Sequence, residues 1–247
     1  DSGEVLLNGR RLTPDAVQRI GYLPEERGLY KKMKVGEQAL YLAQLKGMSK
    51  NDALKALKYW FEKFEIQSWW NKKVEELSKG MAQKVQFVTT ILHKPDLLIF
   101  DEPFSGFDPV NTDLLKREIL SLKENGATII FSTHNMASVE ELCDTISLID
   151  HSKIVLQGNV EDIRAAHATG TYRAITRTEV ELQGVEVLET KAKSRSVEYV
   201  LKAVTGQDNN QLLMQIASQS EVVAFEELLP TMNDIFIDVV TSTKKQL

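Results

Sequence analysis

The sequence has little of what marks disulfide-stapled, membrane-spanning or nucleic-acid-binding proteins. Among its 247 residues there is one cysteine, Cys143, which excludes an internal disulfide framework and fits a reducing compartment. No apolar run approaches the roughly 20 residues that span a bilayer, so any membrane role should be peripheral. The 30 basic and 35 acidic residues are intermixed and give a net charge of -5. This balance gives no electrostatic reason to expect a nucleic-acid partner.

The sequence also lacks a recognisable start. Asp1-Ser2-Gly3-Glu4 is neither an initiator methionine nor a signal peptide with a basic start and an apolar stretch, so we expect a fragment of a longer protein. With 43% hydrophobic and 26% charged residues, the chain can nevertheless bury a full core. Its length has room for one large domain and a smaller one.

Short apolar runs and helical spacing alternate over residues 1–165. Apolar residues recur with helical spacing from 35 to about 76, which predicts an all-helical insertion. A strand, helix and strand in succession predict a buried parallel sheet. The expected elements are strands at 5–7, 20–23, 96–100 and 127–131, a helix at 111–122, a hairpin at 146–156 and a helix at 160–167.

The pattern changes after residue 165. Alternating segments, typical of strands, occur at 178–188 and 196–204. A helix at 210–217, a strand at 221–225 and a last helix at 231–240 complete a small α+β module. We therefore expect an α/β domain over residues 1–165, with a helical subdomain at about 34–92, and an accessory α+β domain over 166–247.

The strongest local signal is a pair of carboxylates at the end of an apolar run. Leu97 to Phe100 precede Asp101, Glu102 and Pro103, and in open α/β sheets ligands bind at the carboxyl ends of the strands. Asp101 would hold magnesium near phosphates, and Glu102 would polarise an attacking water. Taken alone, such a pair is more often a solvated strand end.

A second signal is Ser78, which stands before an amphipathic helix as a natural N-cap. Ser78 and Gly80 at a helix start leave backbone N–H groups open to an anion such as phosphate. An ordinary capped helix is the simpler reading of this segment by itself.

Four motifs in a fixed order then identify a family. They are Leu77-Ser78-Lys79-Gly80-Met81, Asp101-Glu102-Pro103, Ser105-Gly106-Phe107-Asp108-Pro109 and Ser132-Thr133-His134. Together they resemble the ABC ATPases, and Gly21-Tyr22-Leu23-Pro24-Glu25 resembles the Q-loop of that family. The resemblance covers about residues 1–165 and implies a P-loop NTPase core with a parallel sheet.

The resemblance implies a role for each matching residue. ATP would lie between two ATPase subunits, so that Ser78, Lys79 and Gly80 touch the γ-phosphate bound by a partner, and a homodimer is expected. Glu102 and His134 would be catalytic, with His134 contacting the γ-phosphate and holding water in line with Glu102.

The remaining roles concern the metal and the contact between the two sites. The metal would be Mg²⁺, held by Asp101 together with Glu25. Asp108 would support the interface between the two nucleotide sites.

Three departures from the family pattern are visible. Glu25 stands where the Q-loop usually has glutamine; a carboxylate could still ligate magnesium but adds negative charge near phosphate. Lys79 replaces a glycine and could supply positive charge, whereas Met81 replaces a glutamine whose hydrogen bonds it cannot make. This combination resembles the branch of bacterial exporters that includes sodium and drug efflux ATPases.

The fourth departure is the missing motif G-x-x-x-x-G-K-[ST], whose amides and lysine cradle phosphates. We expect it to precede Asp1, and we expect the chain as given to hydrolyse little or no ATP. The resemblance implies an integral membrane subunit as partner and a cytoplasmic, peripheral place on the inner face of a bacterial membrane. The alternatives are a soluble ABC ATPase acting on ribosomes or DNA and a degenerate subunit that binds partners without hydrolysis.

The tryptophans have two readings. Trp69 and Trp70 could line a groove for the membrane subunit, but core packing is favoured for Trp60, Trp69 and Trp70 because large aromatics dominate buried surface.

Overall fold

The computed structural model describes residues 2–26, 28–203 and 209–244, and it divides into two compact units at His134 and Asn135. We describe each unit by itself. Among the described residues, no helix has the length and apolar character needed to cross a membrane.

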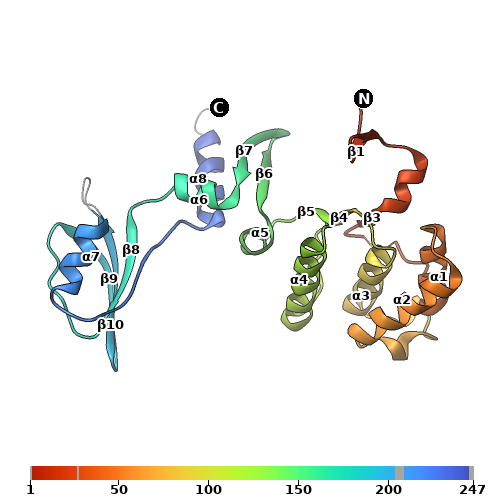
Figure 1. The fold of residues 1–247 in the computed structure, drawn as a ribbon, viewed down its shortest axis with the longest axis horizontal. Coiled ribbons are helices and arrows are strands. Elements are labelled where there is room, and N and C mark those ends of the chain that lie inside the picture. Colours follow the sequence, from red (N-terminus) through yellow and green to blue (C-terminus); the bar gives the residue numbers. More distant parts are fainter. Residues whose placement is uncertain (1, 27, 204–208, 245–247) are drawn as a thin grey trace. The chain divides into compact units, whose positions relative to one another are not determined.

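The first unit is built around a three-stranded parallel sheet (Figure 1). Its strands are β3 (Ile20–Leu23), β4 (Leu97–Asp101) and β5 (Thr128–Ser132), in that order, with β4 in the centre. In this register Leu23 lies opposite Phe100, and Phe100 lies opposite Phe131. The predicted parallel sheet is therefore confirmed.

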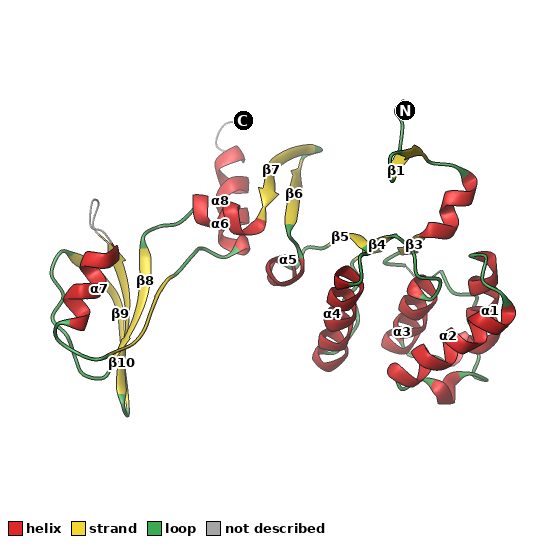
Figure 2. Ribbon diagram, viewed as in Figure 1, coloured by secondary structure: helices red, strands yellow, loops and turns green. Residues whose placement is uncertain are grey.

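Helices cover one face of this sheet (Figure 2). The helical elements are η1 (Pro14–Arg19), α1 (Val35–Leu45), α2 (Lys50–Lys63), η2 (Gln67–Trp69), η3 (Val74–Glu76), α3 (Lys79–Ile91) and α4 (Pro109–Glu124). Side chains of α2, α3, α4 and β4 share one hydrophobic core, in which Leu57, Val85, Phe87, Leu98 and Leu115 are fully buried. We call α1, α2 and α3 the helical layer.

The opposite face of the sheet is open. Tyr22 on β3 and Ile130 on β5 flank Ile99 in the same cross-strand row, and Tyr22 and Ile130 are 55% and 56% exposed. Parallel sheets are ordinarily covered on both faces, so this apolar row is unusual for a parallel strand arrangement.

A short hairpin precedes β3. Its strands are β1 (Leu6–Leu7) and β2 (Arg10–Arg11), joined by Asn8 and Gly9, which both have positive φ. Positive φ at both central residues is the geometry of a type I′ turn, and Asn-Gly is its preferred sequence.

The tryptophans pack in the first unit. Trp60, Trp69 and Trp70 lie partly buried against the hydrophobic core, and the Trp70 ring lies so close to Gly36 that a Cβ there would be 2.3 Å from it. This packing agrees with the core role that the sequence favours.

The second unit contains two hydrophobic clusters. The first combines α5 (Met136–Leu142), the hairpin of β6 (Thr145–Asp150) and β7 (Lys153–Asn159), α6 (Val160–Ala166) and α8 (Met232–Lys244). Buried Met232 and Ile235 of α8 contact Val139 and Ile163, so the last helix packs on elements that precede residue 166. The division into domains at residue 165 stays a prediction.

The second cluster belongs to a four-stranded antiparallel sheet in the order β11-β8-β10-β9. Its elements are β8 (Thr171–Thr176), β9 (Val185–Lys193), β10 (Ser196–Ala203), α7 (Asn209–Ala217) and β11 (Val222–Glu227). Tyr172, Tyr199 and Leu201 of the sheet form a core with Leu212 and Ile216 of α7.

One expected strand is wrong in its position. Residues 177–184 form no strand, although the alternation extended through them, and β8 at Thr171–Thr176 was not anticipated. Side chains satisfy the backbone amides there: Tyr199 Oη accepts from Val180 N at 3.1 Å, and Gln219 Oε1 accepts from Glu181 N at 2.9 Å. Val180 packs on the core of the sheet from outside its ladder.

Candidate nucleotide-hydrolysis site

The predicted catalytic residues gather at one edge of the parallel sheet. Because β3, β4 and β5 are parallel and in register, the residues that follow Leu23, Phe100 and Phe131 emerge at the same edge. We call this the carboxyl edge. Glu25 follows β3, Asp101 is the last residue of β4, and Glu102 comes directly after it.

Glu102 and His134 are in direct contact at this edge. Glu102 Oε1 accepts hydrogen bonds from the backbone N of His134 at 2.9 Å and from its Nδ1 at 2.7 Å. The His134 side chain is 88% exposed and that of Glu102 is 19% exposed. Thr133 Oγ1 also donates to Glu102 Oε2, at 3.4 Å. The loop after β5 therefore holds the carboxylate in place and leaves the imidazole open to a ligand.

The backbone at Glu102 has an uncommon conformation. Its φ is +45°, in the left-handed region that residues other than glycine seldom occupy, and its N–H donates to Ser132 O at 3.1 Å. Such conformations persist only where the surroundings hold them, and they occur often at functional sites. The bonds from residues 132–134 supply that support.

Asp101 contacts the neighbouring strand. Ser132 lies opposite it in the β4–β5 register, and Ser132 Oγ donates to Asp101 Oδ1. The described part of the chain has no group of three or more His, Cys, Asp or Glu side chains that could hold a metal ion. Magnesium at nucleotide sites is usually held by one or two carboxylates, phosphate oxygens and water, so the carboxylates of the carboxyl edge are a suitable donor set.

The segment Ser78–Met81, which we call the signature segment, forms the start of α3. Ser78 is its N-cap, and Ser78 Oγ accepts from Met81 N at 3.3 Å. A Cβ on Gly106 would lie 2.6 Å from Lys79 Cε, and a Cβ on Gly80 would lie 3.4 Å from Gly106 O. The signature segment thus packs against the loop that follows Glu102 in the same chain.

Asp108 ends that loop as the N-cap of α4. Its carboxylate accepts hydrogen bonds from the backbone N of Asn111 at 2.9 Å and from Asn111 Nδ2. The backbone amide of Asn111, followed by its side chain, holds the pKa of Asp108 below its ordinary value. Asp108 is therefore an anchored carboxylate at the junction of the loop with α4.

Glu25 is exposed, and the residues on either side of it accept hydrogen bonds from a side chain of α3. Gln86 is 5% exposed, and its Nε2 donates weakly to Pro24 O at 3.4 Å and to Glu26 O at 3.5 Å. The same helix therefore begins at the signature segment and supports the Q-loop-like residues.

Sequence reasoning missed several of these supporting residues. Ser132 was identified only as part of a motif, although its place directly after an apolar strand could have indicated a partner for Asp101. Gln86 gave no signal beyond its helical spacing, since polar residues on an amphipathic helix are expected to face water. It is buried instead.

The fold and the carboxyl edge define a class of protein: a nucleotide-hydrolase-like α/β unit with a helical layer and an accessory sheet. Comparison with known proteins narrows this class. The family model "ABC transporter" matches residues 1–105, and the model "ATP-binding protein DrrA1-3-like, C-terminal domain" matches residues 158–240.

Individual relatives agree. The chain is 42% identical over 242 residues to the uncharacterized ABC transporter ATP-binding protein YhaQ of Bacillus subtilis, covering 96% of this chain and 80% of that protein. It is 33% identical over 147 residues to the ABC transporter ATP-binding protein NatA of the same species, covering 59% of this chain and 60% of NatA.

A solved ATP-binding subunit of an ABC transporter matches with a TM-score of 0.61 at 32% identity, covering 67% of this chain and 70% of that structure. The chain belongs to the family of ABC transporter ATP-binding proteins and is similar to its NatA-like branch.

Proposed function

We propose that this protein is the ATP-hydrolysing subunit of a membrane exporter and that Glu102 is its general base. The single observation that carries the proposal is the pair of hydrogen bonds from His134 to Glu102 Oε1, at 2.9 and 2.7 Å, beside Asp101 at the carboxyl edge. An oriented carboxylate next to an exposed imidazole suits the alignment of a water with a phosphoryl group.

The other roles follow from the same edge. Asp101 and Glu25 would hold Mg²⁺, which when bound neutralises charge on the phosphates. His134 would contact the γ-phosphate, and it can do so through Nε2 because Nδ1 faces Glu102. While Nδ1 donates to Glu102, Nε2 can donate only when the imidazole carries both protons.

A second subunit completes the site in this proposal. Ser78, Lys79, Gly80 and Met81 at the start of α3 would face the nucleotide of a partner copy, with Asp108 at the contact between sites. The partial positive charge of a helix N-terminus favours such an anion. A homodimer that binds an integral membrane subunit on the cytoplasmic side of the membrane is the assembly we propose.

The 247 residues do not contain the phosphate-cradling motif G-x-x-x-x-G-K-[ST]. The open apolar row of Tyr22, Ile99 and Ile130 supports the view that a further element covers this face of the sheet. We propose that hydrolysis needs a P-loop in addition to these residues and that the chain by itself turns over little ATP.

The test is magnesium-dependent ATP hydrolysis by the complete gene product together with its membrane subunit. We would measure it beside Glu102→Gln and beside the 247-residue chain. Turnover by the complete protein, and its loss in Glu102→Gln with ATP binding retained, is the expected result. An inert complete protein would instead favour a degenerate subunit that binds partners without hydrolysis.

A further inference from the structure

A nearly buried ion pair joins the helical layer to α4. Lys63 Nζ, at the end of α2, lies 2.7 Å from Glu118 Oε2 on α4, 55 residues away along the chain. The Glu118 side chain is 8% exposed and that of Lys63 is 33% exposed. The pair lies away from the carboxyl edge, because Glu118 is ten residues beyond Asp108, about 15 Å along a helix.

Glu118 occupies a position where an apolar residue is expected. Leu115 and Ile119 are 0% and 2% exposed, and with Leu122 they form the stripe of α4 that contacts the core. Glu118 lies within this stripe at helical spacing. A carboxylate there loses its hydration, and that loss is offset only by a well-placed partner. An apolar side chain would give the same packing without this cost, so stability alone does not explain the carboxylate.

Lys63 is held from two sides. Its Nζ lies 5.2 Å from the ring centroid of Trp60 and 5.7 Å from that of Tyr59, in addition to the carboxylate. Burial, the largest single influence, lowers the pKa of Lys63, but the hydrogen bond to Glu118 and the negative charge of that carboxylate together outweigh it, so the pKa is raised. The ammonium group therefore stays charged where the aromatic faces and the carboxylate meet.

The end of α2 is also connected to the catalytic strand. Phe64, next to Lys63, has its ring 5.7 Å from Phe87 of α3, and Phe87 lies 5.7 Å from Phe100. Phe100 directly precedes Asp101 on β4. At the other end of α3, Lys79 and Gly80 pack on Gly106 of the loop after Glu102. The position of α2 and α3 on α4 and β4 therefore determines how the signature segment packs against this loop.

We propose that Lys63 and Glu118 are positioning residues that fix the register of the helical layer on α4, and thereby the placement of the signature segment against the loop 102–108. Aromatic and aliphatic contacts persist when one helix shifts slightly along another. An ion pair within an apolar stripe, in contrast, keeps both charges paired in only one relative position of the two helices. The consequence for hydrolysis rests on the proposed function; the effect on the loop does not.

The experiment compares Lys63→Met with Lys63→Arg, which keeps the charge, in the complete gene product. Lys34→Met is the matched control, because Lys34 pairs with Glu37 at 3.8 Å on an exposed part of the helical layer. One measurement is hydrogen exchange at the amides of Ala82, Ser105 and Phe107, each hydrogen-bonded in the structure. The other is the turnover number and the KM for ATP.

In Lys63→Met we expect exchange at these three amides to accelerate at least about fivefold. A looser contact between the helical layer and α4 should lower the local stability of the signature segment and of the loop 102–108. We expect kcat to fall roughly tenfold or more while KM stays within about twofold, since misplacement affects the transition state more than nucleotide binding. Lys63→Arg should keep the exchange rates and kcat close to those of the unmodified protein, and Lys34→Met should change neither.

Two results would overturn the proposal. One is faster exchange confined to α2 and α4 with the three amides unchanged, which would make the pair a local stabiliser. The other is an equal effect of Lys34→Met. If the unmodified protein hydrolyses no ATP, the proposed function fails, but the exchange measurement still decides the positioning role.

Discussion

One oxygen of Glu102 accepts both hydrogen bonds that come from His134. Oε1 lies 2.9 Å from the backbone N and 2.7 Å from Nδ1 of the histidine. The two bonds differ in what a mutation can remove: the backbone bond survives any change of side chain, whereas the ring bond does not. A substitution of His134 therefore removes the imidazole but keeps the backbone hydrogen bond that holds the carboxylate in place.

The first prediction concerns this pair. His134→Ala keeps the backbone bond to Glu102 and removes the imidazole, so we expect ATP turnover of the complete gene product to fall about 10²- to 10⁴-fold. The affinity for ATP should change little, as measured by equilibrium binding, because in the proposed role the ring acts on the reacting phosphoryl group. His134→Gln keeps a donor and an acceptor and should lose less. A turnover in His134→Ala above half the original rate would contradict the role of the ring.

The second prediction concerns the packing of β3 on α3. A Cβ on Gly21 would lie 2.6 Å from Thr90 O and 2.7 Å from Leu98 Cδ2. Thr90 O belongs to the backbone of α3 and cannot move away cheaply, so Gly21→Ala should lower the free energy of unfolding by about 1–3 kcal/mol. Denaturation with urea would measure it.

Gly28→Ala is the control for this change. No atom lies within 4 Å of a Cβ at Gly28, so we expect a change within about 0.5 kcal/mol. Equal unfolding midpoints for Gly21→Ala and the unmodified protein would show that the close approach at Thr90 is not a constraint.

The sequence was informative where local pattern and tertiary structure agree. The runs ending at Leu23, Phe100 and Phe131 are apolar, as is typical of strands in a parallel sheet, and the polar residues after them emerge at one edge because the three strands run in the same direction. Such features are visible in a single segment of sequence. The family was confirmed by the comparisons, whereas the roles of the individual site residues stay predictions.

Features that depend on distant partners could not be predicted. Residues 177–184 alternate as a strand does. Their backbone amides at 180 and 181 instead donate hydrogen bonds to the side chains of Tyr199 and Gln219. Likewise, nothing local to Glu118 shows that Lys63 reaches it from another helix. In both cases the deciding interaction is made by residues tens of positions away, and periodicity carries no information about them.

The third prediction concerns the pH dependence of stability. Burial, followed by the positive charge of Lys46, lowers the pKa of His93 from 6.5 to about 4. The unfolded chain therefore takes up a proton near pH 6.5, before the folded protein does, so stability falls as the pH falls from about 6.5 to 4. Because His93 is only partly buried, solvent screening should keep the loss from this group below the roughly 3 kcal/mol that the full shift corresponds to, and the loss should level off only below about pH 4.

His93→Gln tests the assignment. Glutamine does not titrate and can still donate to Ile20 O, which lies 3.3 Å from Nε2 of the histidine. The unfolding free energies of the two proteins would be compared from pH 8 to pH 4. We expect the variant to lose less stability over this range, and parallel curves would show that His93 does not contribute to the slope.

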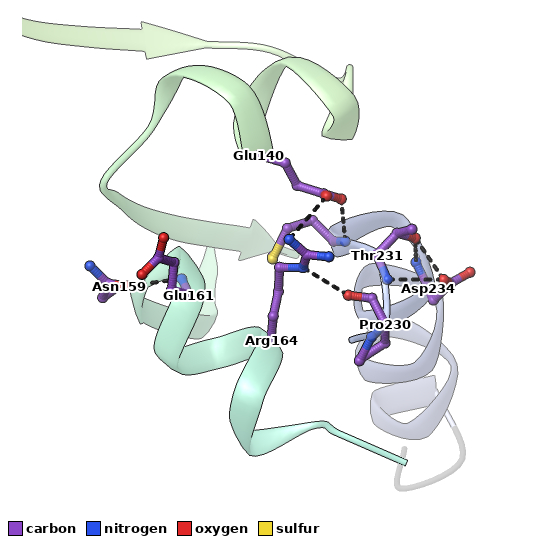
Figure 3. A network of polar contacts seen from close by, with 8 residues as sticks. Glu140, Asn159, Glu161, Arg164, Pro230, Thr231 and Asp234 are labelled. Atoms are coloured by element: carbon purple, nitrogen blue, oxygen red, sulfur yellow. Dashed lines mark hydrogen bonds and ion pairs between the residues drawn. The ribbon is translucent and has the colours of Figure 1, made fainter. Parts of the chain in front are cut away.

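The fourth prediction concerns the attachment of α8 in the second unit, shown in Figure 3. Glu140 Oε1 accepts from Met232 N at 2.6 Å, and Glu140 Oε2 lies 3.5 Å from Arg164 Nη1. Arg164 Nε in turn donates to Pro230 O at 2.9 Å. A carboxylate on α5 and a guanidinium on α6 therefore hold the residues at which α8 begins.

A local cap at the same helix start makes the test specific. Thr231 Oγ1 and Asp234 N are 3.1 Å apart, and Asp234 Oδ2 accepts from Thr231 N at the same distance, so the helix keeps its own cap without Glu140. Glu140→Ala should then detach α8 from α5 without unwinding its first turn. It leaves the amide of Met232 without its acceptor, and such a loss costs about 1–3 kcal/mol.

We expect hydrogen exchange in α8 to accelerate by roughly tenfold or more in Glu140→Ala, which is the ratio that about 1.4 kcal/mol of local stability corresponds to. Glu161→Ala, the same chemical change at an exposed residue of α6, should leave α8 unchanged. Arg164→Met should have an intermediate effect, because the bond from Met232 to Glu140 remains. If α8 exchanges at the same rate in Glu140→Ala and in Glu161→Ala, the apolar contacts of Met232 and Ile235 hold the helix by themselves.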